Sequence, residues 1–366
     1  MSHLYTVAFD SSAGSGTGRL GGKCEALAVM TRAGAPVPPG FVVTTDAFEA
    51  LLDHGGLRRA LDAAVARLAA EPGAVAARGA EIRRIVAEAP VPSEVASAVT
   101  AAYEEFCRSV DCPDAAVAVR SSAEQEDSPR ASWAGQHDTF LWIRGADALL
   151  EAVRRCWASL WTDRAIFYRA THGLWKERQR MAVGVQQMVD ARTSGAAVTV
   201  NPADGDPSKI VVEAVWGLGQ LMVSGQVTPD AYLVDKVLLT TVRATVSPKH
   251  QELVPASDGH GLVRRDVEEG RRRVPCLEPP EVVEVARLAK TVERYYGFPQ
   301  DVEWAIDRHR HASAGATAVL LQTRPETVWS RPRTLAPTSQ GAGVSSILGT
   351  MLGPGRIPAD DGGTAS

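Results

Sequence analysis

The chain has 366 residues, 45% of them hydrophobic and 22% charged, which is enough for two domains or for one large domain of two lobes. Its formal net charge of −4 at pH 7 gives no electrostatic reason to expect nucleic acid or an acidic membrane surface as a partner. Five cysteines without a C-x-x-C pair indicate reduced thiols, and the N-terminal residues hold no apolar signal segment, so we expect a cytoplasmic protein.

A glycine-rich stretch, "SAGSGTGRLGGK", precedes the first predicted helix, which runs from Lys23 to Ala33. Its spacing is not that of a Walker loop, because Gly22 is inserted before Lys23, and it does not fit a dinucleotide-binding fingerprint. Glycine amides and a lysine at the start of a helix can still bind an anion. The stretch therefore permits phosphate binding, and a flexible loop with a surface lysine remains an equally open interpretation.

The segment after this helix is predicted to combine short strands with scaffold helices. "GFVVT" at 40–44 indicates a buried strand, and Thr45 or Asp46 can cap the helix that follows it. The Ala- and Arg-rich region 57–108 predicts at least three helices. "AVAV" then predicts a strand that stops at Arg120, and a polar loop of about 18 residues, a length that is often functional, separates it from the strand "TFLWI".

The second half of the chain is predicted to be rich in strands. A helix is expected over 149–173, followed by strands at 181–189, 195–202, 209–219 and 230–235. Residues 247–275 are charged and weakly patterned, and a helix is expected after Pro279 and Pro280. Two closing strands are expected at 300–307 and 318–324, and the Pro-, Gly- and Ser-rich residues 330–366 are expected to form a disordered tail.

The two closing strands give the sharpest local prediction. Because residues i and i+2 of a strand share a face, Asp301 points the same way as Glu303, and Gln322 the same way as Arg324. A symmetric hairpin about residues 312–313 places Glu303 opposite Gln322 and Asp301 opposite Arg324. Val302, Trp304, Leu321 and Thr323 are then expected on the other face.

This face of the hairpin combines groups that suit a metal and a phosphate. Hard cations such as Mg²⁺ prefer carboxylate and carbonyl oxygens, here Glu303 and Gln322, and usually keep phosphate oxygens as further ligands. A guanidinium such as that of Arg324 binds phosphate as a fork. From these residues alone, a surface hairpin with ordinary cross-strand ion pairs is an equally open interpretation.

Several segments, in order, resemble one family, the ATP-binding domain of phosphoenolpyruvate synthase, pyruvate phosphate dikinase and rifampicin phosphotransferase. The resemblance runs from about residue 20 to 329. It is carried by "GGKCEALAVMTRAGAPVPPGFVVTTDAF", "VAVRSSAEQEDSPRASWAGQHDTFLWI", "VGVQQMV", "SGAAVTVNP", "VEAVWGLGQLMVSGQVTPDAYLVDK", "YYGFPQDVEWAID" and "LLQTRPETVW". It implies an α+β ATP-grasp fold in which ATP and Mg²⁺ bind between an N-terminal lobe, 1–190, and a C-terminal lobe, 191–329.

The resemblance also implies roles for individual residues. Glu303 and Gln322 match the family's metal ligands, Arg120 and Arg324 its phosphate-binding arginines, and Asp301 a neighbouring acid, so that Arg120, Arg324 and Asp301 are the expected catalytic residues. The residues expected to contact ATP are Lys23, Arg120, Gly135, Thr139, Gln186, Glu303, Gln322 and Arg324. Cys24, Glu25 and Ala26 depart from the family's usual "GGKGAN", which puts the contact of Lys23 with phosphate in question.

Full-length relatives pass phosphate through a histidine on a swivelling domain, and none of the eight histidines here lies in the matching Thr-Ser-His context. The resemblance therefore implies the ATP-binding subunit of a split dikinase. Such a subunit would transfer the β-phosphate of ATP to a histidine on a separate partner, which then phosphorylates a small molecule. Two alternatives stay open, a non-catalytic nucleotide-binding module and an ATP-grasp kinase or ligase that acts directly on a small molecule.

Overall fold

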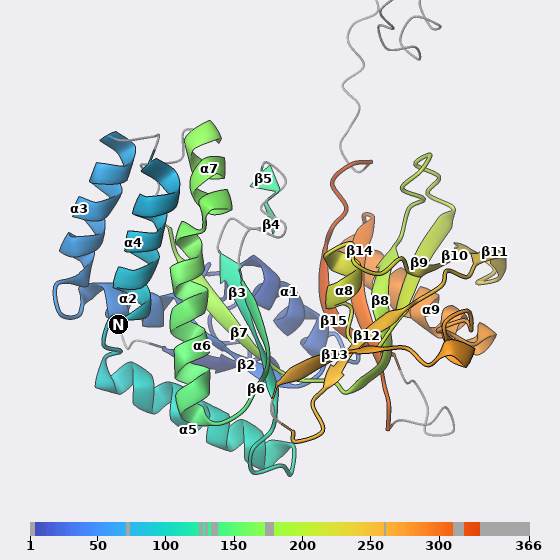
Figure 1. Cartoon of the computed structure of the whole chain (residues 1–366), viewed down its shortest axis with the longest axis horizontal. Coiled ribbons are helices and arrows are strands. Elements are labelled where there is room, and N and C mark those ends of the chain that lie inside the picture. The colour runs from blue at the N-terminus through green and yellow to red at the C-terminus, as the bar shows by residue number, and fades with distance from the viewer. Residues whose placement is uncertain are drawn as a thin grey trace, which may run out of the picture. The chain divides into compact units, whose positions relative to one another are not determined.

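The computed structural model of the chain (Figure 1) describes residues 4–70, 74–123, 127–128, 131–132, 138–172, 179–259, 261–309 and 318–329. The chain divides into a compact unit, Met1–Ser330, and a second unit, Arg331–Ser366. The second unit lies outside the described residues, so the disorder predicted for it stays a prediction. Two antiparallel sheets with helices form the first unit, so the predicted α+β class is confirmed. Among the described residues, no helix combines the length and the apolar character needed to cross a bilayer.

The first sheet contains five strands in the order β1-β2-β7-β3-β6. Their bounds are Thr6–Ala8 for β1, Gly40–Val43 for β2, Met181–Gln187 for β7, Val117–Ala123 for β3 and Thr139–Ile143 for β6. One face is covered by α2 (Thr45–Asp53), α5 (Ser93–Ser109) and α6 (Ala146–Ala158), with α3 (Leu57–Ala70), α4 (Val75–Ala87) and α7 (Asp163–His172) behind them. The pair β4 (Asp127–Ser128) and β5 (Ala131–Ser132) stands apart from this sheet.

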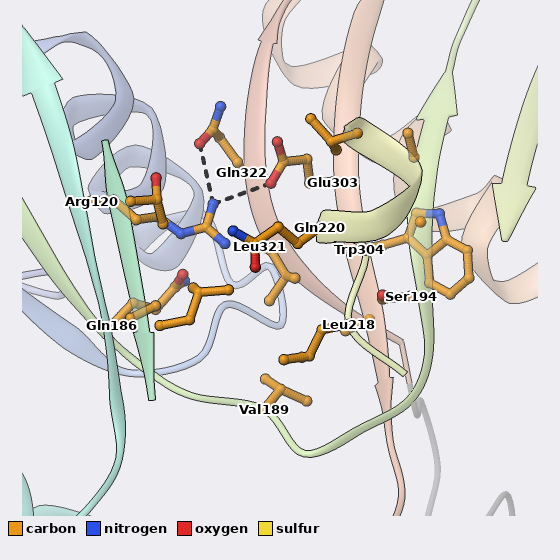
Figure 2. Close-up of a pocket in the computed structure, with 18 of the residues that line it drawn as sticks. Arg120, Gln186, Val189, Ser194, Leu218, Gln220, Glu303, Trp304, Leu321 and Gln322 are labelled. Atoms are coloured by element: carbon orange, nitrogen blue, oxygen red, sulfur yellow. Dashed lines mark hydrogen bonds and ion pairs between the residues drawn. The ribbon is translucent and has the colours of Figure 1, made fainter. Parts of the chain in front are cut away.

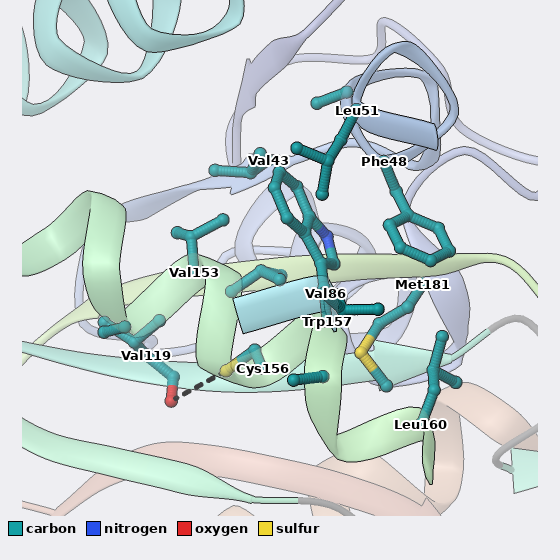
Figure 3. Close-up of a cluster of buried hydrophobic side chains, with 14 of the residues drawn as sticks. Val43, Phe48, Leu51, Val86, Val119, Val153, Cys156, Trp157, Leu160 and Met181 are labelled. Carbon is teal, nitrogen blue, oxygen red and sulfur yellow. Dashed lines mark hydrogen bonds between the residues drawn. The ribbon is translucent and has the colours of Figure 1, made fainter. Parts of the chain in front are cut away.

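A large apolar core fixes the helices on this face of the sheet (Figure 3). Trp157 of α6 is fully buried and stacks on Phe48 of α2 with ring centroids 5.7 Å apart. Cys156 beside it is also fully buried, and burial raises the pKa of its thiol well above the usual value. This thiol therefore stays protonated and serves the core as a small apolar group rather than as a nucleophile.

The second sheet contains six strands in the order β11-β10-β9-β8-β14-β15. Their bounds are Thr241–Thr245 for β11, Asp230–Asp235 for β10, Lys209–Trp216 for β9, Ala191–Val198 for β8, Gln300–Asp307 for β14 and Ala318–Pro325 for β15. Helix α9 (Pro279–Tyr296) covers one face and begins with a capping box between Glu278 and Glu281. Short helix α8 (Gln220–Val223) and the hairpin β12–β13 (Gln251–Pro255 and Leu262–Asp266) pack on the other side.

The start of helix α1 (Gly21–Arg32) packs against Ser122, near the end of β3. The Ser122 hydroxyl accepts from the amide of Cys24 and donates to the carbonyl of Leu20, both at 3.0 Å, so it caps a helix whose own N-cap residue supplies no side-chain cap. Gly21 has φ +66°, and a Cβ there would lie 1.9 Å from the Ser122 carbonyl oxygen. The close approach therefore requires glycine, and it holds the start of α1, with Lys23, beside the strand that carries Arg120.

The other end of α1 contacts the second sheet. Met30 belongs to the core beneath α9, and the amide of Leu320 on β15 donates to the carbonyl of Pro36 at 2.9 Å. Helix α1 and the turn after it therefore join the two sheets, in addition to the covalent connection between β7 and β8.

Most predicted elements are confirmed, including the three helices of 57–108 and the two closing strands. Four predictions about these elements are wrong in detail. Strand β3 does not stop at Arg120 but continues to Ala123, because Ser121, Ser122 and Ala123 also pair with β7. The N-cap residue of α2 is Thr44 rather than the predicted Thr45 or Asp46. The Thr44 hydroxyl donates to the carbonyl of Leu4, so it does not cap the helix. The predicted helix 149–173 is interrupted by the 3-10 turn Ser159–Trp161, and the weakly patterned 247–275 contains the hairpin β12–β13 and a 3-10 turn, Glu269–Arg271.

The α1–β3 contact predicts that Gly21→Ala destabilises the fold more than Gly34→Ala. Both glycines have positive φ, +66° and +79°, but a Cβ at Gly34 meets nothing within 4 Å. Gly34→Ala should therefore cost about 1 kcal/mol of conformational strain, whereas Gly21→Ala adds a backbone clash and should cost about 3 kcal/mol. Urea unfolding measures both, and equal costs would contradict the proposed close approach.

Candidate functional site

A cavity of about 490 Å³ lies between the two sheets and is lined by both (Figure 2). This volume is in the usual range for a small-molecule site. The first sheet, α1 and the β7–β8 linker contribute Lys23, Ala118, Arg120, Asp138, Thr139, Leu141, Gln186, Gln187, Met188 and Val189. The second sheet and α8 with its preceding turn contribute Ser194, Gly195, Ala196, Leu218, Gly219, Gln220, Met222, Val223, Asp301, Glu303, Trp304, Ala305, Leu321, Gln322 and Arg324.

Arg120 connects the two sides of this cavity. Its Nη1 donates to Glu303 Oε2 at 3.1 Å and to Gln322 Oε1 at 3.2 Å, although these residues follow it by 183 and 202 positions in the chain. The Arg120 side chain is 16% exposed, and its buried Nε has no hydrogen-bond partner among the described residues. A buried cationic donor without a partner is costly, so this group favours an anionic ligand.

The predicted register of the closing hairpin is confirmed. Glu303 pairs with Gln322 and Asp301 with Arg324 across β14 and β15. Arg324 donates from Nε and Nη2 to Asp301 Oδ2 at 2.8 and 2.6 Å. The prediction for Leu321 is wrong, because the register shifts after Glu303 and Leu321, as the extra residue, lines the cavity.

The described lining is electrostatically balanced at its polar end. It contains three cations, Lys23, Arg120 and Arg324, and three carboxylates, Asp138, Asp301 and Glu303. A polyphosphate entering this cavity would bring several negative charges that the side chains alone do not neutralise. A divalent cation bound together with the phosphate would supply the missing positive charge.

Glu303 and Gln322 fit such a cation by chemistry and by direction. Their oxygens converge on a single guanidinium nitrogen, so they face one position that a cation can occupy. Among the described residues, no group of three His, Cys, Asp or Glu is arranged to hold a metal. Two protein ligands suit Mg²⁺ with substrate phosphates and water completing its octahedron, whereas a permanently bound structural metal would need more.

The opposite end of the cavity is apolar and suits a flat heterocycle. Val189 and Leu218 lie there, away from Glu303 and Gln322 (Figure 2). Gln186 is 2% exposed, and its buried Nε2 has no hydrogen-bond partner among the described residues. Because an unpaired buried amide is unfavourable, Gln186 would gain from a ligand that accepts a hydrogen bond.

The structure brings nearly all of the sequence-predicted site residues to this one cavity. Those that line it are Lys23, Arg120, Thr139, Gln186, Asp301, Glu303, Gln322 and Arg324. Gly135 lies outside the described residues, as does His137 in the same loop. Their individual roles in binding or catalysis stay predictions.

Sequence reasoning missed other residues of the cavity wall, among them Ser194, Leu218 and Gln220. The turn that carries Leu218 is held by Leu253 of β12, whose carbonyl accepts the Leu218 amide at 2.9 Å. Glu213 of β9, which does not line the cavity, was also not singled out from the sequence. Burial, with the nearby Asp301 carboxylate as a smaller cause, raises its pKa. The two glycines in "WGLGQ" predict a turn but not the segment against which the turn packs. The sequence alone therefore could not assign these residues to the cavity wall.

Comparisons with known proteins place the chain in a family. Residues 17–341 match the family model described as "Pyruvate phosphate dikinase, AMP/ATP-binding domain". A phosphoenolpyruvate synthase of Aeropyrum pernix is 36% identical over 94% of this chain and 44% of its own length. A probable phosphoenolpyruvate synthase of Methanothermobacter thermautotrophicus is 38% identical over 88% of this chain and 46% of its own. The chain thus spans less than half the length of these curated relatives.

The convergence of Glu303 and Gln322 predicts that Glu303→Gln loses metal-dependent ATP affinity. The amide keeps the shape but removes the charge, so affinity in Mg²⁺ should fall about tenfold or more. In EDTA it should be unchanged or slightly higher, because Arg120 is released from its ion pair. Calorimetry measures the ATP affinity in Mg²⁺ and in EDTA. Glu293→Gln is the control, since Glu293 pairs with Lys236 outside the cavity lining. Equal losses with and without Mg²⁺ would remove Glu303 from the metal site.

Proposed function

The chain belongs to the pyruvate phosphate dikinase AMP/ATP-binding domain family, and from this premise we propose that it is the ATP-binding subunit of a split dikinase. In this proposal it binds ATP and Mg²⁺ in the cavity between the sheets and transfers the β-phosphoryl group to a histidine on a separate protein. ATP, water and the partner's histidine thereby give AMP, inorganic phosphate from the γ position, and phosphohistidine that carries the former β-phosphoryl group. The partner then passes this group to a small molecule.

One observation carries the proposal, the meeting of Arg120 from the first sheet with Glu303 and Gln322 from the second. A cationic donor and two oxygen ligands for a hard cation then stand at the same end of the cavity. Phosphoryl transfer needs positioning and charge neutralisation more than covalent chemistry from the protein, and these groups supply both.

Each side chain has a distinct task in this proposal. Arg120 and Lys23 hold the phosphate oxygens from the first sheet and from α1, and Arg324, oriented by Asp301, holds them from the second sheet. Glu303 and Gln322 would hold Mg²⁺, which when bound neutralises charge on the phosphates. Gln186 and the apolar wall orient the base, so that the transferred group keeps one position relative to the cations.

The acceptor is proposed to come from outside this cavity. No histidine is among the described residues that line it, and neither is a cysteine or tyrosine. Without a nucleophile held in line with the phosphates, the donor site alone should turn over slowly. A histidine presented by a partner protein would complete the reaction.

The proposal predicts product identity. The chain is incubated with Mg-ATP, alone and with histidine-domain proteins from the same cell, and AMP, ADP and phosphoprotein are resolved. Alone it should form little product, and with its partner it should form AMP, phosphate and phosphohistidine. ADP formed on a small acceptor without phosphohistidine would favour a direct kinase or ligase. ATP binding without turnover by any partner would favour a non-catalytic module.

A further inference from the structure

The linker between β7 and β8 forms one end of the cavity and is anchored to the first sheet on its N-terminal side. Gln187, Met188 and Val189 all line the cavity. The amide of Gln187 donates to the carbonyl of Pro39 at 2.8 Å, and that of Met188 to the carbonyl of Ala116 at 2.9 Å. Up to Met188, the linker is therefore fixed to the first sheet by backbone hydrogen bonds.

On its C-terminal side the same linker is gripped by Arg308, the residue after β14. The Arg308 amide donates to the Asp190 carbonyl at 2.8 Å, and its Nε donates to Asp190 Oδ1 at 3.3 Å. Its Nη2 donates to the carbonyl of Ala191 at 3.3 Å. His309, which is exposed, adds a contact from Nε2 to Asp190 Oδ2 at 3.3 Å. Arg308 thus contacts the last residue of the linker, Asp190, and the first residue of β8, Ala191.

This grip ties the linker to the strand that carries the predicted metal ligand. Glu303 lies four residues before the end of β14 at Asp307, which is about 13 Å along a strand. The linker end and the Glu303 end of the cavity are therefore connected along β14, by the β8–β14 pairing that reaches Ala191 and, one residue further, by Arg308 on Asp190 (Figure 2 shows Val189 and Glu303 at these ends). Neither Arg308 nor Asp190 lines the cavity, so neither is placed to touch a ligand there.

We propose that Arg308 is a positioning residue, which sets the separation between the base end and the phosphate end of the nucleotide site by clamping Asp190 to β14. The inference rests on the proposed function, because it takes the cavity to hold ATP. ATP binds both ends at once, so its affinity contains a term for their matched spacing, as for any ligand with two connected binding parts. A ligand that occupies one end alone lacks this term.

The test compares ligands that use both ends with ligands that use one. Arg308→Gln and Arg308→Lys are titrated with Mg-ATP, with adenosine, and with magnesium tripolyphosphate, and their thermal unfolding is recorded. Arg192→Gln is the matched control. Arg192 is 31% exposed, close to the 33% of Arg308, and pairs with Glu281 rather than with the linker.

For Arg308→Gln, the affinity for Mg-ATP should fall on the order of tenfold, while those for adenosine and for magnesium tripolyphosphate stay within about twofold of the original. Arg308→Lys should recover part of the loss, because an ammonium can pair with Asp190 but cannot also span to Ala191. Arg192→Gln should leave all three affinities unchanged.

Two results would contradict the positioning role of Arg308. One is an unchanged affinity of Arg308→Gln for Mg-ATP. The other is an equal loss of affinity for all three ligands, which would indicate general damage to the cavity. Failure of the underlying function is distinguishable. In that case the unaltered chain itself binds neither Mg-ATP nor adenosine, whatever residue stands at position 308.

Discussion

The guanidinium of Arg120 spans the cleft between the two sheets, and the remaining features of the site are arranged around it. It belongs to β3 on one side and reaches the paired Glu303 and Gln322 on the other. For this contact to form, β14 and β15 must keep their register and α1 must stay against β3. The Gly21–Ser122 contact meets the second requirement, and the hydrogen bond from Leu320 to Pro36 holds the turn after α1 to β15.

A charge that is buried between two oxygen ligands also explains why the site suits ATP together with a metal. Removing one partner of such a contact leaves an uncompensated charge, which is unfavourable. A cation bound by Glu303 and Gln322 and a phosphate bound by Arg120 can replace this contact. Each group then pairs with a ligand that complements its own charge or dipole. The same residues are therefore stabilised whether they pair with each other or with the two parts of a metal–nucleotide complex.

The sequence predicts those parts of the site that depend on local geometry. The pairing of Asp301 with Arg324 follows from strand periodicity and from the symmetry of one hairpin, and the structure has this register. The bulge that turns Leu321 into the cavity could not be predicted, because Leu321 packs against residues far away in the sequence, such as Val189 and Leu218. The hairpin β12–β13 was missed because β13 is largely exposed and charged and lacks an alternating apolar pattern. The grip of Arg308 on Asp190 joins residues 118 apart, a distance over which local patterns carry no information.

The most direct test of the account is a crystal structure of the chain with Mn²⁺ and a non-hydrolysable ATP analogue, in which anomalous scattering locates the ion. The account predicts an ion about 2.0–2.2 Å from the side-chain oxygens of Glu303 and Gln322, a spacing typical of small divalent cations. It also predicts that Arg120 donates to phosphate oxygens and that the base lies against Gln186 and the linker. An ion elsewhere, with Arg120 still bonded to Glu303 beside bound nucleotide, would contradict it.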